Sequence, residues 1–197
     1  AKNAVKRFKK EGKKKILEIG AGQGRDTIYF AQNGLEVFAL DYRENAIKSI
    51  KNKGDKLNLT KFINIKKHNL KERLPFPNES FEACFSHMLY CMEFSSKELE
   101  FISSEIKRIL KPNGLNIYTV RNIKDKHFKK GVHHGEYMYE MDGFIVHFFS
   151  EEKIKKLSKG FDILNISEFN EGRLPRKLYE VTLKKNSFEL RVSFILL

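Results

Sequence analysis

The chain has 197 residues, enough for one domain with a sizeable core, and it holds no apolar run long enough to predict a membrane span. No apolar leader opens it, and two cysteines suit a reducing compartment, so we expect a cytoplasmic protein with no membrane partner. The net charge of +13 raises nucleic acid as a partner, but only nine of the 38 basic residues are arginine and aromatics do not interleave with them. Nucleic acid is therefore possible but not favoured.

The first elements expected are a basic helix at 3–11, a strand at 15–19 and a helix at 25–32. Between the strand and the second helix, glycines stand at alternate positions, Gly20, Gly22 and Gly24, directly after Glu18 and Ile19. This pattern predicts a strand, a tight turn and a helix, with the turn at the carboxyl end of the strand. Such a turn lets a ligand approach the backbone, and it lies where open α/β sheets bind their ligands.

The spacing of the glycines separates two classes of cofactor. A dinucleotide fingerprint is G-x-G-x-x-G, whereas here the third glycine comes one residue early and Arg25 takes its place. Glu18 is a poor neighbour for a pyrophosphate but a good partner for an ammonium group or a ribose. The pattern therefore favours a nucleoside with a cationic, zwitterionic tail. The alternative is a tight turn that binds no ligand.

The next strand, at 36–40, ends at an acidic residue. Asp41 follows Gly20 by twenty-one residues, the spacing at which a carboxylate binds ribose hydroxyls in nucleotide-binding α/β folds. The simpler alternative is that Asp41 caps the helix expected at 44–53. Tyr42 would cover one face of the nucleoside.

At these residues the sequence resembles the class I S-adenosylmethionine (SAM)-dependent methyltransferases, whose first motif is E/D-x-G-x-G-x-G. The resemblance implies SAM as cofactor, S-adenosylhomocysteine as product, and a contact with adenine after the strand at 62–66. Asn69 stands there in place of the family's usual acidic residue, and an amide oxygen can accept the same hydrogen bond. The cofactor-binding residues expected are Glu18, Gly20, Ala21, Gly22, Gly24, Arg25, Asp41, Tyr42, Asn69, Leu70 and Ser86.

The resemblance runs from about residue 15 to residue 121. The segment Leu74–His87 resembles the family's entry into its fourth strand, here expected at 81–86. A helix expected at 96–110 and a strand at 115–121 flank the sequence Lys111-Pro112-Asn113-Gly114, in which Asn113 replaces a family glycine. Asn tolerates left-handed backbone, so the exchange is mild. The fold class expected is α/β, a Rossmann-like doubly wound sheet of seven strands, mostly parallel with an antiparallel C-terminal hairpin.

Three residues near the ends of the fourth and fifth strands are candidates for catalysis: His87, Tyr90 and Arg121. His87 and Tyr90 are placed to face the methyl group, and His87 has a pKa suited to a general base if the acceptor is a hydroxyl or an amine. Packing against the cofactor is an equally good interpretation of His87. Arg121 is suited to hold an anionic acceptor.

The segment 122–149 is too long for a turn and is rich in His, Tyr and Phe. We expect it to be a lid that binds the acceptor, because long loops in compact domains are commonly binding loops. The alternative is an insertion packed by its own aromatic residues. A metal site built from His133, His134, Glu136 and His147 is conceivable, but adjacent histidines point in different directions, so no metal is expected.

The remaining elements expected are a helix at 150–157 and two antiparallel strands at 161–166 and 178–184. The apolar tail 188–197 is suited to add an edge strand or to pack on a partner. No repeat or linker divides the chain, so 1–197 is expected to form one methyltransferase domain, as a monomer or a homodimer.

The function expected is transfer of a methyl group from SAM to a small-molecule acceptor by in-line displacement. The general likeness is greatest to the branch of tellurite-resistance and thiopurine methyltransferases. Two alternatives remain open: an RNA or protein methyltransferase that uses the basic surface, and an inactive SAM-binding sensor or partner protein.

Overall fold

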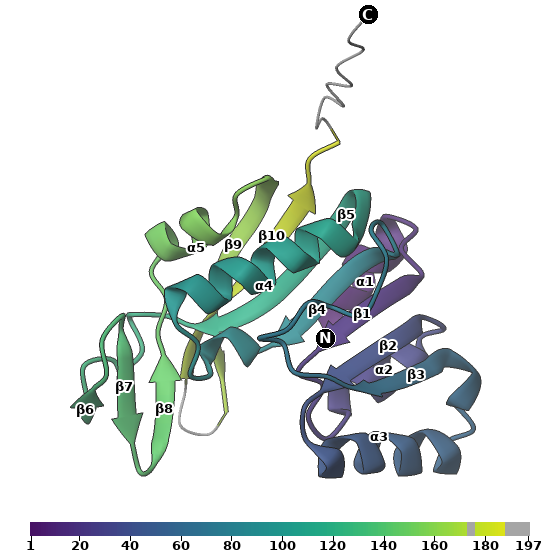
Figure 1. The fold of residues 1–197 in the computed structure, drawn as a ribbon, viewed down its shortest axis with the longest axis horizontal. Coiled ribbons are helices and arrows are strands. Elements are labelled where there is room, and N and C mark those ends of the chain that lie inside the picture. Colours follow the sequence, from purple (N-terminus) through teal and green to yellow (C-terminus); the bar gives the residue numbers. More distant parts are fainter. Residues whose placement is uncertain (173–175, 188–197) are drawn as a thin grey trace, which may run out of the picture.

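The computed structural model describes residues 1–172 and 176–187, and Figure 1 shows a twisted sheet with helices on both faces. The seven strands lie in the order β3-β2-β1-β4-β5-β10-β9. Their bounds are β1 (Lys15–Ile19), β2 (Glu36–Asp41), β3 (Ile63–Lys67), β4 (Phe81–His87), β5 (Leu110–Arg121), β9 (Phe161–Glu171) and β10 (Arg176–Lys185). The first five strands are parallel, and β10 runs antiparallel to β5 and β9. The predicted fold class is confirmed.

The helices pack on the sheet in two layers. They are α1 (Lys2–Lys10), α2 (Arg25–Gln32), α3 (Glu44–Lys56), α4 (Ser96–Ile109) and α5 (Glu151–Leu157), with short 3-10 turns at η1 (Thr60–Phe62) and η2 (Leu89–Cys91). Buried residues of α4 and α5 pack in one large cluster on the face that is in front in Figure 1. Residues of α1, α2 and α3 pack on the opposite face. No helix within the described ranges is both long and apolar enough to cross a bilayer.

Successive side chains of β4 point to opposite faces of the sheet, so this one strand packs against both helix layers. Phe85 packs edge-on against Phe30 of α2, with ring centroids 4.9 Å apart, and Phe30 in turn contacts Phe8 of α1. The neighbouring Cys84 faces the cluster on the side of α4. Since successive side chains of a strand point to opposite faces, this continuous apolar run requires helices on both sides.

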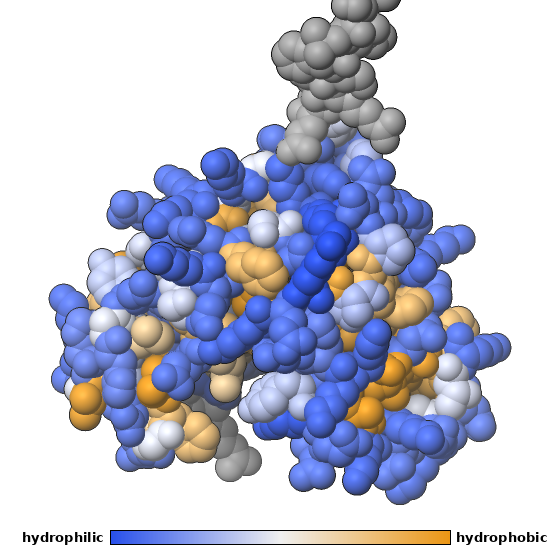
Figure 2. Space-filling view, viewed as in Figure 1, coloured by the Kyte–Doolittle hydropathy of each residue, from blue (hydrophilic) through white to orange (hydrophobic). Residues whose placement is uncertain are grey.

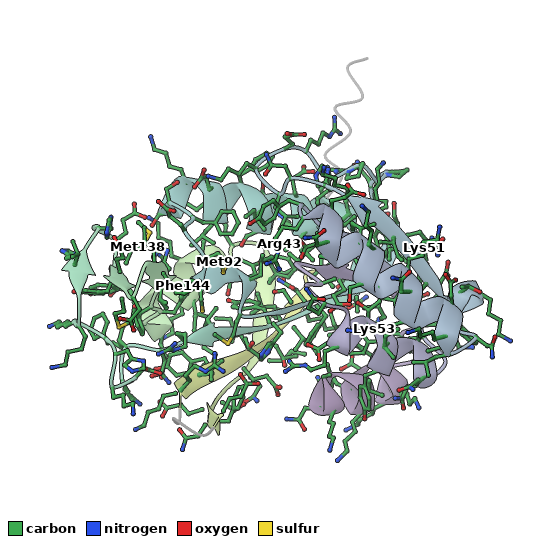
Figure 3. All side chains as sticks on the ribbon, turned by 90° about the horizontal axis from the view of Figure 1, so that it is seen from below. Arg43, Lys51, Lys53, Met92, Met138 and Phe144 are labelled. Atoms are coloured by element: carbon green, nitrogen blue, oxygen red, sulfur yellow. The ribbon has the colours of Figure 1, made fainter. Side chains whose placement is uncertain are left out.

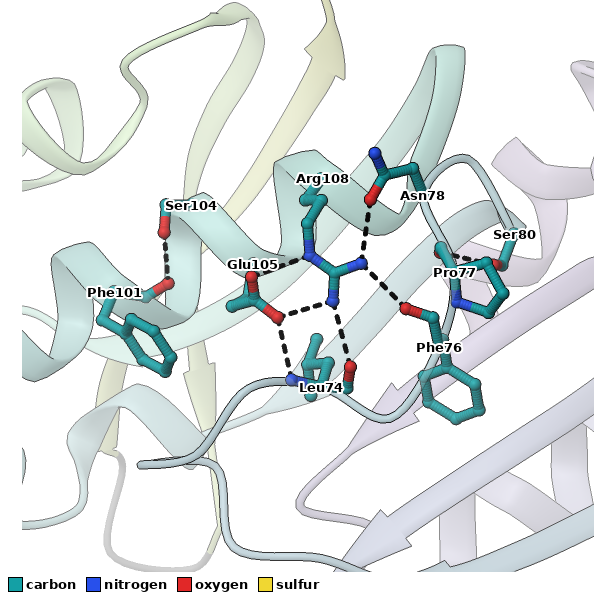
Figure 4. A network of polar contacts seen from close by, with 9 residues as sticks. All are labelled: Leu74, Phe76, Pro77, Asn78, Ser80, Phe101, Ser104, Glu105 and Arg108. Atoms are coloured by element: carbon teal, nitrogen blue, oxygen red, sulfur yellow. Dashed lines mark hydrogen bonds and ion pairs between the residues drawn. The ribbon is translucent and has the colours of Figure 1, made fainter.

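A polar network fastens the chain between β3 and β4 to helix α4 (Figure 4). Arg108 donates to the carbonyls of Leu74 and Phe76, to the side chain of Asn78 and to both oxygens of Glu105. Glu105 also accepts from the Leu74 N–H at 2.8 Å. The ion pair with Arg108 lowers the pKa of the Glu105 carboxyl. This network fixes the entry into β4 that the sequence motif predicted.

The fifth strand begins earlier than expected, at Leu110 rather than at residue 115. Leu110 already pairs with Phe81, and the register then shifts before Ala83 pairs with Leu115. The extra residues form a bulge in which Asn113 has a left-handed φ of 59°. The tolerance expected for the exchange of glycine for Asn113 is confirmed by this conformation.

The segment 122–149 forms a small sheet of its own. Its strands β6 (Val132–His133), β7 (Met138–Met141) and β8 (Phe144–His147) are antiparallel, in sequence order. Figure 1 shows this sheet beyond the carboxyl end of β5. The structure therefore puts secondary structure where the sequence predicted a lid, and its role as a lid stays a prediction. The tail at 188–197, expected to form an edge strand or to pack on a partner, lies outside the described residues.

Candidate functional site

The turn between β1 and α2 is built from glycines in left-handed backbone. Gly20, Gly22 and Gly24 have φ of 69°, 55° and 79°. A β-carbon on Gly20 would lie 2.6 Å from Leu89 Cδ1, and one on Gly24 would lie 2.6 Å from Ile50 Cγ1. At Gly22 the nearest atom would be 4.0 Å away. Packing therefore requires two of the glycines, while Gly22 presents an open stretch of backbone suited to a ligand.

Asp41 joins this turn to the end of β2. Its Oδ2 accepts from the Gly22 N–H at 2.8 Å, and its Oδ1 accepts from the Arg43 N–H at 3.0 Å. The N-cap of α3 is Arg43, not Asp41, which places Asp41 beside the turn and not at the cap suggested by the simpler interpretation. Each carboxylate oxygen keeps acceptor capacity. The arrangement fits a group with two adjacent hydroxyls lying over Gly22.

Glu18 is 3% exposed at the end of β1 and accepts from the Thr27 hydroxyl at 2.5 Å. Burial raises the pKa of its carboxyl from 4.5 to about 8, and the nearby Asp26 adds to the rise while Thr27 opposes it. The carboxyl is therefore protonated near neutral pH. A cationic ligand beside it would favour its ionised form.

The other residues expected to bind cofactor take different positions. Tyr42 is 64% exposed beside Asp41, and the exposed Arg25 forms an ion pair with the buried Asp26. The Asn69 amide is used inside its own turn, where its oxygen accepts from the Lys71 N–H. Two other expected contacts are less exposed: Leu70 is half-buried against the main core, and the hydroxyl of buried Ser86 has no hydrogen-bond partner in the part of the chain that the structure describes.

His87 lies where β4 ends, between the turn and the antiparallel hairpin. Its Nδ1 is 2.8 Å from the Thr119 hydroxyl, which also accepts from the Met88 N–H at 3.0 Å. Its Nε2 is 3.3 Å from Glu171 Oε1. Burial lowers the pKa of the His87 ring, although Glu171 partly opposes this, so the ring is neutral near pH 7.

Tyr90, the second catalytic candidate, is not brought to the site. It is 1% exposed within the large cluster, and its ring centroid is 4.7 Å from that of Tyr118. Burial raises the pKa of its hydroxyl well above 10. Helical turn η2 directs this side chain inward, which the sequence position alone did not reveal.

Arg121, the third candidate, is buried and already paired. Its Nε and Nη2 donate to the two oxygens of Asp125 at 3.0 and 2.7 Å, and its guanidinium carbon lies 5.3 Å from the centre of the Phe148 ring. His127 Nδ1 lies 2.9 Å from Nη2. Asp125 therefore neutralises the charge that was expected to hold an anionic acceptor.

The histidines of segment 122–149 have separate partners. The ring of His133 stacks on Tyr139, and His134 pairs with Glu140. The Nδ1 of His147 donates to the Phe94 carbonyl. Glu136 accepts from the Ser96 N–H, and no three potential metal ligands gather at one point within residues 1–172 and 176–187.

The molecular surface is hollowed between the small sheet and the part that carries α3 (Figure 2). Figure 3 views the molecule from that side, with Arg43 and Met92 near the centre and Met138 and Phe144 on the small sheet. Met92 is 52% and Phe144 73% exposed, so apolar side chains are accessible near the centre of this view and on the small sheet. Sequence reasoning missed Thr119 and Glu171, because their roles depend on contacts with His87 from distant elements. It also missed Arg43, which contacts Asp41 two residues away but belongs to no motif.

Comparison with known proteins identifies the family. The methyltransferase domain profile matches residues 16–114. Phosphoethanolamine N-methyltransferase 3 of Arabidopsis thaliana is 34% identical over 101 residues, which are 50% of this chain and 20% of that protein. Demethylmenaquinone methyltransferase of Tropheryma whipplei is 30% identical over 99 residues, 50% of this chain and 38% of that protein. The chain thus aligns with less than half of the length of these relatives.

Solved structures agree on the fold. A SAM-dependent methyltransferase from Methanosarcina mazei superposes with a TM-score of 0.76 at 21% identity, over 88% of this chain and 93% of that one. TehB from Haemophilus influenzae superposes with a TM-score of 0.73 at 19% identity, over 94% and 62%. Since the profile covers half of the sequence and the fold is shared, the chain belongs to the methyltransferase domain family, as the motif around Gly20 predicted.

Proposed function

We propose that this chain transfers a methyl group from SAM to a small-molecule acceptor by in-line displacement. The observation that carries the proposal is the open backbone at Gly22, hydrogen-bonded to the buried carboxylate of Asp41. This pair offers acceptor oxygens for two ribose hydroxyls and no β-carbon to exclude the sugar. Bound SAM supplies a methyl carbon that its sulfonium already makes electrophilic.

The residues of this chain would bind SAM and orient the acceptor. Asp41 would hold the ribose, and Glu18 would ionise beside the ammonium of the methionine moiety. Tyr42 and Leu70 would cover the adenine ring. Positioning of the acceptor in line with the methyl group is the main contribution to rate that such a site makes.

The hollow beside the small sheet supports a small acceptor over a macromolecule. Met92 and Phe144 expose apolar side chains on this side of the molecule, and lysines are distributed over the whole chain rather than gathered with aromatic residues in one nucleic-acid surface. The aligned relatives carry the names of enzymes that methylate small molecules, phosphoethanolamine and demethylmenaquinone.

Calorimetric titration tests the proposal. SAM or S-adenosylhomocysteine should bind and NAD should not, and Asp41→Ala should weaken binding by about tenfold or more because a buried hydrogen-bonding carboxylate is lost. Asp162→Asn, an exposed change on β9, is the matched control and should leave the affinity unchanged. Unaltered affinity in Asp41→Ala with the fold intact would refute the ribose assignment.

Binding and transfer measurements on the same protein distinguish the two alternative functions. Binding to RNA that weakens steeply with salt would favour a nucleic-acid substrate. Tight SAM binding with no transfer to any acceptor would favour a sensor.

Repeating the titration in buffers of different ionisation enthalpy should show proton release at pH 7 in the wild type and none in Glu18→Gln, because the ligand's ammonium would ionise Glu18.

A further inference from the structure

The end of β9 lies beside the end of β4 and brings a second carboxylate to the site. Glu171, the last residue of β9, lies with its Oε1 3.3 Å from His87 Nε2. The Glu171 side chain is 27% exposed and that of His87 is 21% exposed. His87 is the only partner within ion-pair distance of Glu171 among residues 1–172 and 176–187. Within these residues the carboxylate therefore has no close cationic partner and is partly exposed, while Arg25 acts on it from farther away.

Thr119 determines which atom of the His87 ring faces Glu171. The Thr119 hydroxyl lies 2.8 Å from Nδ1, and it is itself held by the N–H of Met88, whose φ of 55° turns the chain sharply after β4. In the tautomer whose Nδ1–H donates to the Thr119 hydroxyl, Nε2 is the ring nitrogen with a lone pair for proton transfer. A neutral base and a negative charge thus stand side by side at the open end of β4.

Such a pair suits a cation that must lose a proton before it reacts. A protonated amine can donate to Glu171 and to His87 Nε2 at once, whereas a thiolate or an oxyanion would meet the repulsion of Glu171. Among the described residues, Arg25 and Asp26 of α2 also act on His87, and they pair with each other. These two charges cancel, so Glu171 is the charge that selects between a cationic and an anionic acceptor.

We propose that the acceptor is a small amine, bound as an ammonium ion by Glu171 and deprotonated by His87. This inference rests on the proposed function. His87 Nε2 takes one proton from the ammonium; the freed nitrogen lone pair forms the N–C bond to the methyl group as the C–S bond breaks. The electron pair of that bond goes to sulfur, leaving S-adenosylhomocysteine and a methylated ammonium.

The test is transfer of labelled methyl groups from SAM to ethanolamine, glycine, 2-mercaptoethanol and selenite, with SAM binding measured in parallel. We expect transfer to at least one of the two amines and to neither of the others. Glu171→Gln should raise KM for the amine about tenfold or more with little change in kcat. His87→Gln should lower kcat and remove the acid limb of its pH profile. Glu168→Gln, a surface carboxylate of the same strand paired with Lys124, should change neither.

Two outcomes overturn the inference without touching the proposed function. One is transfer to the thiol or selenite that Glu171→Gln leaves unchanged, and the other is SAM binding with no transfer to either amine. Failure of the wild type to bind SAM would refute the proposed function itself. As a readout that needs no turnover, ethanolamine or glycine titrated into the complex with S-adenosylhomocysteine should bind the wild type at least about tenfold more tightly than Glu171→Gln. Thermal unfolding of each variant shows whether its fold is retained.

Discussion

Two regions of the molecule meet at the candidate site, and they are built in different ways. The cofactor side, residues 15–41, depends on backbone: left-handed glycines, strand ends and one carboxylate that bonds main-chain amides. The proposed acceptor side, residues 122–149 and the end of β9 at Glu171, depends on side chains that reach across elements, such as His87 to Glu171. Local sequence patterns predict backbone geometry, whereas they do not predict contacts between distant elements. The class of cofactor could therefore be predicted from the sequence, and the acceptor could not.

The largest effect should come from the buried carboxyl on the cofactor side. Glu18 has a pKa of about 8 when folded and 4.5 as its ordinary value, so between pH 4.5 and 8 the unfolded chain loses the proton first. The stability that Glu18 contributes is present below pH 4.5 and is lost as pH rises to 8, on the order of 5 kcal/mol in all. Glu18→Gln should remove this slope. Denaturant unfolding of both proteins from pH 5 to 8.5 measures it, and parallel curves would contradict it.

The acceptor side should show the opposite dependence on pH. Buried His147 donates to the Phe94 carbonyl and lies 2.5 Å from Lys153 Nζ, and burial followed by Lys153 lowers its pKa from 6.5 to about 4. The contribution of neutral His147 to the free energy of unfolding is present above pH 6.5 and is lost as pH falls to 4, on the order of 3 kcal/mol. His147→Gln should remove the rise in stability between pH 4 and 6.5, whereas Glu18→Gln should remove the fall between pH 4.5 and 8, so the two variants change the profile in opposite directions where these ranges overlap. Hydrogen exchange at pH 5 should report the change first in β8, and equal protection there in wild type and variant would speak against it.

Glycine-to-alanine substitutions test a further difference between the two regions, namely how closely other atoms pack against a left-handed glycine. Gly24→Ala forces a β-carbon into left-handed backbone at 2.6 Å from Ile50 Cγ1 and should cost about 2–3 kcal/mol. Gly135 has an equally left-handed φ of 82°, but a β-carbon there meets nothing within 4 Å, so Gly135→Ala should cost about 1 kcal/mol. Chemical denaturation of the two variants gives the difference directly. Equal costs would mean that packing behind the turn does not restrict it.

The helices and the strands of the main sheet followed from sequence, although β5 begins five residues earlier and β9 ends five residues later than expected, and the small sheet β6–β8 was not predicted. The strand at 15–19 and the helix at 25–32 are found as predicted, because apolar periodicity and the glycine turn fix both ends. The inward turn of Tyr90 and the pairing of Arg121 with Asp125 were not predictable, because each depends on a neighbour brought close by the fold. The early start of β5 at Leu110 likewise depends on pairing with Phe81.

The smallest effect concerns a residue on the cofactor side that local structure disfavours. Arg43 is the N-cap of α3 but makes no capping hydrogen bond, and it brings positive charge to the positive end of the helix. Its guanidinium instead reaches back to Asp41, 3.5 Å from Oδ1, and lies nearest to the space above Gly22. Arg43→Ser should supply a cap and raise stability by about 0.5–1 kcal/mol.

The same variant should weaken S-adenosylhomocysteine, because it removes a side chain that borders the open backbone. A gain in thermal stability together with a lower calorimetric affinity would mean that Arg43 contributes to ligand binding and destabilises helix α3. Lys67→Ser, an exposed change at the end of β3 whose side chain pairs with Glu44, is the control and should not raise stability. If Arg43→Ser gained stability and also bound more tightly, the guanidinium would be a competitor for Asp41, and the cofactor side would include an element that opposes binding.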